Sequence, residues 1–498
     1  MELLTDSPIE SSTPSGAAAT GYNVPLIIRG KVIEGDAIQF GGRGMGVRFS
    51  TPDVSQHLDS LMLTRPSAMA DLLALSFEDI LDYLAALGEK LSIENNVYLQ
   101  EALELSIRTS GLSAPILRHT YSRIGAFYDR NSLRDAADRT VGIPYIDGWV
   151  EREMRDGCIS SLRAVGARSV HVIAGNTPGV AALTIARNAL IRSDAVIKTP
   201  SNDPATAAAI ARTMIDMAPD HPITRHVSVA YWKGGDEKIE QQIYQPSKVE
   251  KIVAWGGFAS ISHISKYLQP GIDLITLDPK LSSTIIGKEA FDSEEAMAEV
   301  ARRLAKDVGF YNQEACLNAR VVYVQSGTDD EGLAKANRLG ELLLAAVRAL
   351  PLYRSGPAAN PSAELAEEVE SLKIGSEWHK VIGGGPEGAV IVSQTDEPVD
   401  FARILTNRVA NLVPFDDLDL PISAVNAYTQ TIGIYPESLK AQIRDRLAIQ
   451  GAQRIVSLGA APLTVLGGPQ DGIEPLRRMC KWIADEYRTP ERIEELTQ

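Results

Sequence analysis

Residues 310–324, FYNQEACLNARVVYV, place a cysteine in surroundings that suit a reactive thiol. Cys316 follows a helical pattern that stops at Gly309 and precedes a β-branched run, Val321 to Val324, that predicts a buried strand. Polar residues flank the cysteine, whereas a free thiol that fills a core usually packs among aliphatic side chains. The pattern alone fits a buried or incidental thiol more often than a nucleophile on a loop beside a strand, and the nucleophile is favoured only when the rest of the chain is considered.

The sequence gives no reason to place another cysteine or a histidine beside Cys316. Cys480, beside Met479 on the apolar side of a predicted helix, is expected in the core, and Cys158 receives no assignment. A nucleophilic cysteine requires a lowered pKa, yet none of the seven histidines forms a motif with the thiol. His263 lies on an apolar helix face and is expected to be structural. No metal-ligand spacing occurs, so we predict no metal.

Three turns between a strand and a helix carry further candidate groups. Asn176, in AGNTPG, could cap a helix or donate its amide to a developing oxyanion. Lys198, in IKTPSNDP, could be simply solvated or could bind a ribose or phosphate. Gly256 and Gly257, in AWGGFAS, would let a backbone approach a pyrophosphate closely, but paired glycines also make ordinary turns. No GxGxxG motif follows a predicted strand.

Alternating elements must position these groups. Between residues 169 and 278, Val/Ile-rich strands alternate with single helices, which predicts a doubly wound parallel sheet. We assign 1–23 to a disordered lead-in, 24–278 to an N-terminal region and dinucleotide-binding domain, and 279–429 to a catalytic α/β domain. Residues 430–498 are expected to return to the cofactor domain and to make oligomer contacts, with a final helix over 474–486.

The bulk properties exclude some classes of partner. The 498-residue chain has a net charge of −15 and no basic block, which argues against nucleic acid. The acidic, Ser/Thr-rich N-terminus does not resemble a signal peptide, and no apolar run reaches the length of a membrane span. We therefore expect a cytoplasmic protein without a membrane span.

Five segments occur in the order and approximate spacing of the aldehyde dehydrogenase superfamily, which the chain resembles from about residue 169 to 459. They are AGNTPG, IKTPSNDP, AWGGFAS, LITLDPKLSSTII and YNQEACLNARVVYV. Through IIRGK, TNRVANLVP and GGPQDGIEPLRRMCKWI, the chain is similar to the acyl-CoA reductase branch, which includes the long-chain fatty acid reductase of bacterial bioluminescence. The resemblance implies an α/β, aldehyde dehydrogenase-like fold, with a doubly wound cofactor domain and a second α/β catalytic domain.

The resemblance also implies catalytic roles for three residues. Cys316 matches the nucleophile, and Asn176 matches the oxyanion-hole asparagine, which would act with the backbone N–H of Cys316. Asp278 is the nearest counterpart of the general-base glutamate, but it is one methylene shorter and is followed by proline. A displaced base would suit an enzyme whose acyl group leaves by reduction instead of hydrolysis.

The implied cofactor-binding residues are Lys198, Ser201, Gly256 and Gly257. Ser201 stands where an NAD-preferring member carries an acidic residue, so a 2′-phosphate is not repelled there. This favours NADPH and leaves NADH as an alternative. The Glu-Ile-Phe-Gly-Pro segment that holds the nicotinamide ribose has no counterpart, because the chain reads ILTNRVAN at that place.

Taken together, the resemblance and the residues predict NADPH-dependent reduction of an acyl thioester, such as a medium- or long-chain acyl-CoA or an acyl-protein, to the aldehyde. The reaction would pass through a thioacyl group on Cys316. One alternative is NAD(P)-dependent oxidation of an aldehyde to an acid or acyl-CoA. Another is a redox-inactive acyl-carrying subunit. The resemblance also implies a homo-oligomer and allows a complex with an acyl-transferring partner.

Overall fold

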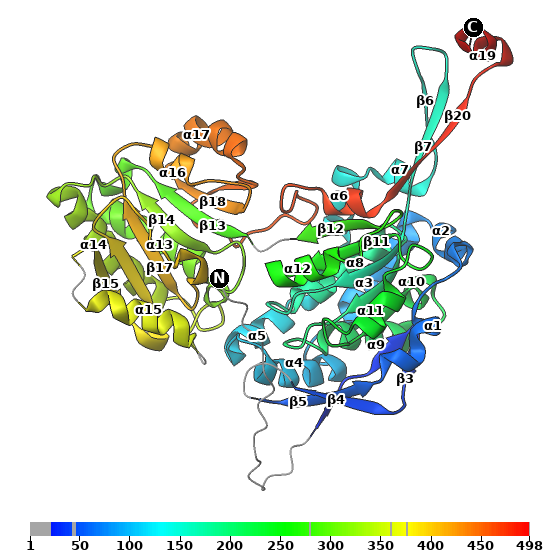
Figure 1. Ribbon diagram of the computed structural model, residues 1–498, viewed down its shortest axis with the longest axis horizontal. Coiled ribbons are helices and arrows are strands. Elements are labelled where there is room, and N and C mark those ends of the chain that lie inside the picture. The colour runs from blue at the N-terminus through cyan, green and yellow to red at the C-terminus, as the bar shows by residue number, and fades with distance from the viewer. Residues whose placement is uncertain (1–20, 42–45, 278–279, 359–360, 375–376, 498) are drawn as a thin grey trace.

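The computed structural model describes residues 21–41, 46–277, 280–358, 361–374 and 377–497. Two α/β domains lie side by side, and a narrow three-stranded arm projects from the first domain (Figure 1). The predicted α/β class and its parallel sheets are confirmed. In the described part of the chain, no helix is long and apolar enough to cross a membrane.

The first domain is built on a mostly parallel sheet. Its strand order is β12 (Asp273–Leu277), β11 (Lys251–Trp255), β8 (Arg168–Val172), β9 (Asp194–Lys198), β10 (Val227–Ala230), β2 (Leu26–Ile28) and β3 (Lys31–Ile33). Strands β12 to β10 run parallel, and β2 and β3 add an antiparallel edge. A smaller sheet joins β1 (Tyr22–Asn23), β5 (Arg48–Pro52) and β4 (Ala37–Gly41).

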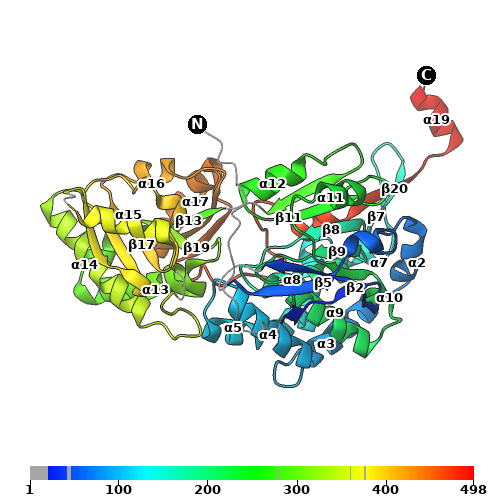
Figure 2. The ribbon, with the colours of Figure 1, turned by 60° about the horizontal axis from the view of Figure 1, so that its bottom comes forward.

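Helices cover both faces of this sheet, as the continuous Val/Ile strands predict. Neighbouring residues show the alternation, because Val196 packs into one core cluster and Ile197 into the other. Figure 2 shows the two helical layers on opposite sides of the strands. One layer includes α3 (Phe77–Lys90), α4 (Val97–Thr109), α5 (Ala114–Tyr121), α6 (Arg130–Thr140), α8 (Gly179–Leu190) and α9 (Thr206–Met217). The other includes α1 (Leu58–Leu61), α11 (Glu237–Ile243) and α12 (Phe258–Ser265).

The second domain has its own parallel sheet. Its order is β15 (His379–Gly383), β16 (Ala389–Ser393), β17 (Val409–Pro414), β14 (Ala319–Val324), β13 (Leu281–Ile286), β18 (Thr429–Tyr435) and β19 (Arg454–Ser457), with only β15 antiparallel. The helices α13 (Glu294–Gly309) and α14 (Asp330–Arg348) pack on one face. The other face carries α16 (Asp419–Ser423) and α17 (Glu437–Gln450), while α15 (Ala363–Lys373) packs near β16.

The catalytic domain was predicted to end at residue 429, but its sheet continues beyond that residue. Strands β18 and β19 pair in parallel beyond β13, so the chain up to Ser457 belongs to the second sheet and not to the cofactor domain. The alternation of strand and helix in this segment fits either domain, and only the strand with which it pairs shows to which domain it belongs. At the other end, Tyr22 and Asn23 form β1 beside β5, although they were assigned to a disordered lead-in. Residues 1–20 lie outside the described part of the chain.

The predicted helix over 474–486 is wrong. A short helix, α18 (Pro475–Met479), is followed by β20 (Lys481–Tyr487), which pairs antiparallel with β7 (Ile159–Val165) along its whole length. The arm is completed by β6 (Val150–Glu153) and ends in α19 (Pro490–Thr497). Backbone pairing with a distant strand overrides a weak local helical pattern.

Shorter helices of the first domain are α2 (Ala70–Leu73), α7 (Ile143–Asp147) and α10 (Pro222–Arg225).

Candidate active site

Parallel strands bring the predicted cofactor residues to one edge of the first sheet. Strands β11, β8 and β9 are neighbours, and their carboxyl ends lead to Gly256, Asn176 and Lys198 respectively. Ser201 follows in the turn after β9. The carboxyl edge of an open α/β sheet is where ligands bind. The topology thus places together residues that the sequence separates by as many as 80 positions.

Asn176 lies in the bend between β8 and α8 and is partly exposed. Pro178 occupies the N-cap of α8, so the alternative that Asn176 caps this helix is wrong. The turn is fixed from the neighbouring loop, where Asn202 Nδ2 donates to the Gly175 carbonyl at 3.0 Å. Within the described residues, no hydrogen bond links Asn176 to Cys316, and its oxyanion role stays a prediction.

Lys198 is not a simply solvated lysine. Its Nζ lies 5.8 Å from the ring centroids of both Tyr231 and Trp232, within the range of a cation–π contact. Burial lowers the pKa of Lys198 to about 8, against the opposing charge of Glu240. A cation held at the ligand edge of the sheet is suited to bind a phosphate or ribose.

Glu240 is a buried carboxylate that sequence reasoning missed. It accepts hydrogen bonds from the Tyr267 hydroxyl and the Gly235 N–H, each at 3.2 Å. His263 Nε2 lies 2.6 Å from the same carboxylate, which gives His263 a contact with Glu240 and not with the thiol. The periodicity of α11 marks its apolar face but does not reveal that a glutamate on this short helix is buried.

The glycine turn after β11 leaves its backbone accessible. Gly257 forms the N-cap of α12, and a Cβ built on it would meet no heavy atom within 4 Å. At Gly256 a Cβ would lie 3.1 Å from Ser260. The open backbone at Gly257, next to the free N–H groups of α12, can accept close approach by an anionic group.

The polar residues before Cys316 shape its turn. Tyr311, Asn312 and Gln313 have positive φ of 50°, 52° and 67°, a strained run for residues other than glycine. Asn312 Oδ1 accepts the Gly356 N–H at 2.8 Å. Gln313 donates from Nε2 to the Ala319 carbonyl at 2.8 Å, and its Oε1 accepts the Val409 N–H at 2.9 Å. These buried side-chain bonds hold the backbone that presents Cys316.

The beginnings of two strands contact Cys316, one at its sulfur and one at its carbonyl. Gln430 Nε2, at the start of β18, donates to Cys316 Sγ at 3.2 Å. The same nitrogen donates to Asp471 Oδ1 at 2.6 Å. The Ser282 hydroxyl of β13 donates to the Cys316 carbonyl at 2.7 Å. No sequence motif joins Gln430 or Asp471 to the cysteine, and neither was predicted.

The electrostatic surroundings raise the pKa of the Cys316 thiol, contrary to the expected lowering. Burial is the largest cause, and the carboxylate of Asp471 adds to it. The hydrogen bond from Gln430, the backbone N–H of Cys316 and the positive charge of Arg320 act in the other direction but are weaker. Burial and the Asp471 carboxylate therefore both disfavour the thiolate of Cys316.

The amino edge of the second sheet faces the carboxyl edge of the first. Strand β12 ends at Leu277 and β13 begins at Leu281, so few residues separate the two edges. The rings of Phe258, from α12, and Tyr428, before β18, lie 5.5 Å apart. Residues 459–473 return to the first domain, where Arg187 of α8 donates to Gln470 Oε1 at 3.0 Å. Cys316 therefore lies on the side of its domain that meets the cofactor edge.

Two further predictions concern a base and a metal. Asp278, the candidate base, falls outside the described residues and stays a prediction. The described part of the chain contains no group of three or more His, Cys, Asp or Glu side chains that could hold a metal ion.

A family model described as acyl-CoA reductase (LuxC) matches residues 72–482. The chain belongs to this family. It is 29% identical to the long-chain acyl-protein thioester reductase of Aliivibrio fischeri, covering 86% of this chain and 87% of that one. It is 30% identical to the enzyme of the same name from Photorhabdus luminescens, covering 83% and 82%.

Solved structures support the same superfamily fold. The LuxC-family chain superposes on lactaldehyde dehydrogenase from Escherichia coli with a TM-score of 0.71 at 15% identity, covering 94% of this chain and 100% of that one. An NADP-dependent glyceraldehyde-3-phosphate dehydrogenase from Bacillus halodurans, complexed with NADP, gives a TM-score of 0.70 at 15% identity, covering 94% and 99%. The predicted resemblance to the acyl-CoA reductase branch is confirmed by the family model, and the chain shares the fold of the aldehyde dehydrogenases.

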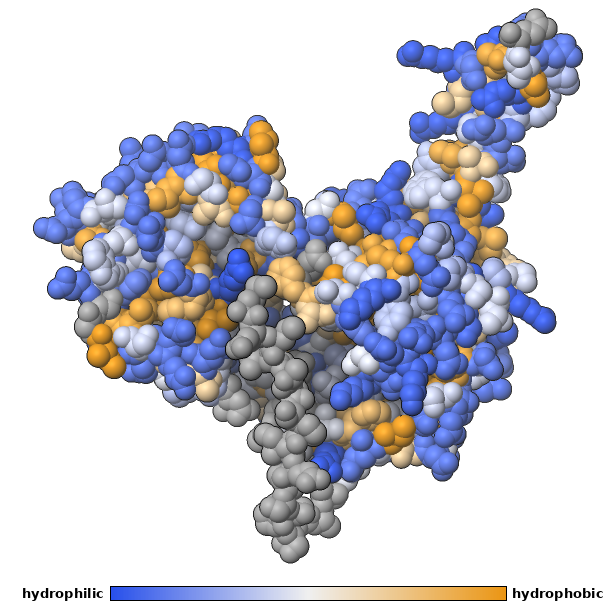
Figure 3. All heavy atoms as spheres, viewed as in Figure 1, coloured by the Kyte–Doolittle hydropathy of each residue, from blue (hydrophilic) through white to orange (hydrophobic). Residues whose placement is uncertain are grey.

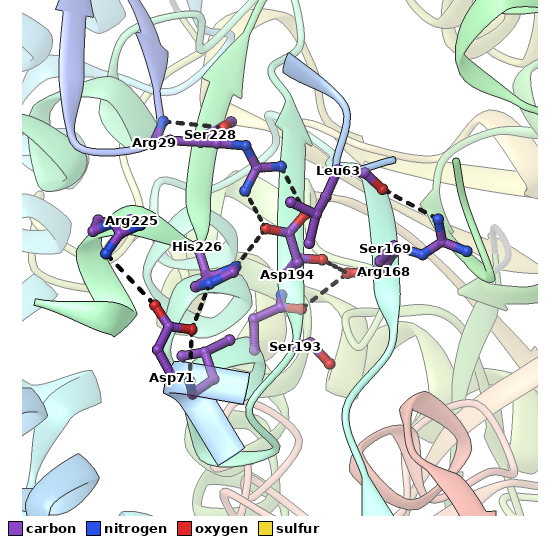
Figure 4. Close-up of polar contacts among 12 residues, drawn as sticks. Arg29, Leu63, Asp71, Arg168, Ser169, Ser193, Asp194, Arg225, His226 and Ser228 are labelled. Carbon is purple, nitrogen blue, oxygen red and sulfur yellow. Dashed lines mark hydrogen bonds and ion pairs between the residues drawn. The ribbon is translucent and has the colours of Figure 1, made fainter. Parts of the chain in front are cut away.

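This LuxC-family chain also contains a charged cluster at the opposite, amino-terminal edge of the first sheet (Figure 4). Asp194, at the start of β9, accepts from Arg29 at 2.5 and 3.0 Å, and His226 Nδ1 lies 2.7 Å from it. His226 Nε2 lies 2.9 Å from Asp71. Burial acts to raise the pKa of Asp194, but the bonds from His226 and Arg29 outweigh it and lower that pKa. Because the cluster lies at the edge away from the predicted cofactor residues, we assign it a structural role.

Proposed function

We propose that this protein reduces a long-chain acyl thioester to the aldehyde through an acyl group bound to Cys316. The observation that carries the proposal is the thiol on a strained, hydrogen-bonded turn that faces the cofactor edge of a LuxC-family chain. A nucleophilic cysteine divides the reaction into acyl transfer and reduction. The names of the relatives, long-chain acyl-protein thioester reductases, support an acyl group of this kind.

The donor thioester is the finer part of the proposal. The sequence led us to expect a medium- or long-chain acyl-CoA, whereas the names of the relatives refer to acyl-protein substrates. We therefore propose an acyl group that arrives on a protein, as from an acyl-transferring partner, with acyl-CoA as a second donor of the same thioester chemistry.

The residues at the first sheet edge fit a nicotinamide dinucleotide. The open backbone at Gly257 and the cation of Lys198 can hold phosphate or ribose groups, and Ser201 presents no carboxylate to a 2′-phosphate. These features support NADPH over NADH. When bound, the reduced nicotinamide supplies the hydride that turns an acyl group into an aldehyde.

Residues of this chain accept the acyl group, transfer the proton and stabilise the oxyanion. Attack by Cys316 forms one acyl–sulfur bond and breaks another, and the proton lost by Cys316 leaves with the donor thiol. After reduction, cleavage of the carbon–sulfur bond returns the electron pair to Cys316, which then takes up a proton. The amide of Asn176 and the backbone N–H of Cys316 hold the oxyanion in both stages.

We also propose that copies of the chain associate through the arm. Figure 3 shows apolar side chains along this projection, and Trp149, Met154, Ile483 and Tyr487 are between 42% and 61% exposed. A small sheet is stable when one apolar face is packed against something else, and these side chains of the arm are exposed. Burial of these side chains and of a free strand edge against a second copy would remove them from water.

Acyl labelling tests the proposed function. Incubation with a radioactive long-chain acyl-CoA, or with an acylated partner protein, should label wild-type protein but not Cys316→Ala, which should also form no aldehyde. Asn176→Ala should keep the label but lower kcat about 10²–10³-fold. Cys480→Ala, which alters a buried thiol in the core of the first domain, is the control and should label normally. A label on Cys316→Ala would contradict the proposal, as would rapid aldehyde oxidation without any thiol acceptor.

A further inference from the structure

The side chains around Cys316 Sγ point to a function for two residues to which the sequence analysis assigned no role. We propose that Gln430 and Asp471 form a positioning pair, in which Gln430 directs the sulfur of Cys316 and Asp471 holds Gln430 in place. This inference rests on the proposed role of Cys316 as the acyl acceptor. Neither residue needs to touch the substrate, because both act through the sulfur.

Gln430 is placed by the register of two strands. It is buried at the start of β18, and the next residue, Thr431, donates its N–H to Ser282 Oγ at 3.1 Å. The same hydroxyl donates to the Cys316 carbonyl. Strands β13 and β18 therefore hold both the backbone and the sulfur of the nucleophile. An N–H directed at sulfur stabilises the thiolate that attacks the donor and that leaves when the aldehyde departs.

Asp471 reaches the thiol from the segment that returns to the first domain. It has a positive φ of 52° and is followed by Gly472 at 77°. The backbones of Gln470 and Ile473 close this loop with hydrogen bonds of 2.8 and 3.0 Å. Since Arg187 of α8 holds Gln470, the loop that carries Asp471 is anchored to the cofactor domain while its carboxylate contacts the catalytic domain.

Charged groups of both signs face the sulfur. Arg320 of β14 and Arg454 of β19 interact electrostatically with Cys316 and are fixed by backbone carbonyls, Arg320 by Leu405 at 2.7 Å and Arg454 by Ala461 at 2.8 Å. Asp471 is the carboxylate that opposes them at the thiol. The pair therefore has two separable effects: the Gln430 N–H favours the thiolate, and the Asp471 charge disfavours it.

Opposite changes in thiol reactivity test the pair. The rate of Cys316 alkylation by iodoacetamide, measured by peptide mass spectrometry from pH 6 to 10, reports the thiolate fraction. Asp471→Asn keeps an acceptor for Gln430 but removes the charge, so alkylation at pH 7 should rise about five- to tenfold. Gln430→Leu removes the donor and should slow alkylation by a similar factor. Asp445→Asn, an exposed carboxylate on α17, is the control and should leave the profile unchanged.

The outcomes separate the two proposals. Profiles for Asp471→Asn and Gln430→Leu that coincide with wild type, in protein whose thermal unfolding is normal and whose Cys316 still accepts the acyl label, would overturn the positioning pair alone. The same holds if both variants shift the profile in one direction. Failure of wild-type Cys316 to accept the acyl label would overturn the proposed function instead.

Discussion

At the scale of single residues, the polar neighbours of Cys316 in the sequence stabilise the backbone of its turn and do not form a polar surface around the sulfur. Asn312 and Gln313 do not surround the sulfur as a solvated loop; they are buried and hold the turn by backbone contacts. The groups that act on the sulfur are Gln430 and Asp471, from distant segments. Residue type therefore indicated a candidate nucleophile, while the side chains that contact its sulfur come from segments far away in the sequence.

Lys198 gives a pH prediction at this scale. Burial lowers its pKa to about 8, so the ammonium is present below that pH and lost above it. In wild type, kcat/KM for NADPH should fall as the pH rises through about 8, because the neutral amine cannot pair with phosphate. At pH 7, Lys198→Gln should lower kcat/KM for NADPH about ten- to a hundredfold and lack this pH step. Lys266→Gln, an exposed lysine after α12, should behave as wild type. An unchanged pH step in Lys198→Gln would contradict the assignment.

At the scale of elements, the link between α13 and β14 matters most. The helix ends at Gly309, as predicted, but Gly309 has an ordinary φ of −86°, and a Cβ there would lie 2.6 Å from Leu350. Close packing against Leu350 therefore favours glycine here, and a left-handed cap does not account for it. The left-handed backbone falls instead on residues 311–313, where side-chain hydrogen bonds offset the strain.

Two substitutions at Asn312 separate backbone strain from hydrogen bonding. Asn312→Gly keeps the positive φ but leaves the Gly356 N–H without its acceptor, which should cost about 1–3 kcal/mol of unfolding free energy. Asn312→Ala adds the strain of a left-handed Cβ, about 1 kcal/mol more. Urea unfolding measures both, and Asn131→Ala on the exposed surface of α6 should stay within about 0.5 kcal/mol of wild type. Equal stability of the Gly and Ala variants would show that the turn is not strained.

At the scale of the whole molecule, the site is a junction between two sheets. The proposed cofactor residues lie at the carboxyl edge of one sheet, and the thiol lies at the amino edge of the other. The segment 459–473 and the contact of Phe258 with Tyr428 join the two sides. The arm, which lies away from this junction in Figure 1, is available for contact with a second copy.

The arm supplies a prediction at the same scale. Tyr487→Asp places a charge on an exposed aromatic position of β20, where burial against a second copy would be strongly unfavourable. We expect light scattering after size exclusion to show a smaller species than wild type. Leu352→Asp, an exposed apolar residue of the second domain, should keep the wild-type mass. If Tyr487→Asp and wild type have the same mass, the arm does not mediate association.

The sequence by itself determined the fold class, the family and the short segments that contain the candidate nucleophile and cofactor residues. Those features are local, since strand and helix periodicity and the turns between elements lie within a few consecutive residues. Only the tertiary structure decided that β18 and β19 join the second sheet, that residues 481–487 form a strand, and that Gln430, Asp471 and Glu240 lie beside reactive groups. Strand pairing and side-chain contacts of this kind join segments as far apart in the sequence as Cys316 and Asp471. A pattern within a few consecutive residues cannot reveal them.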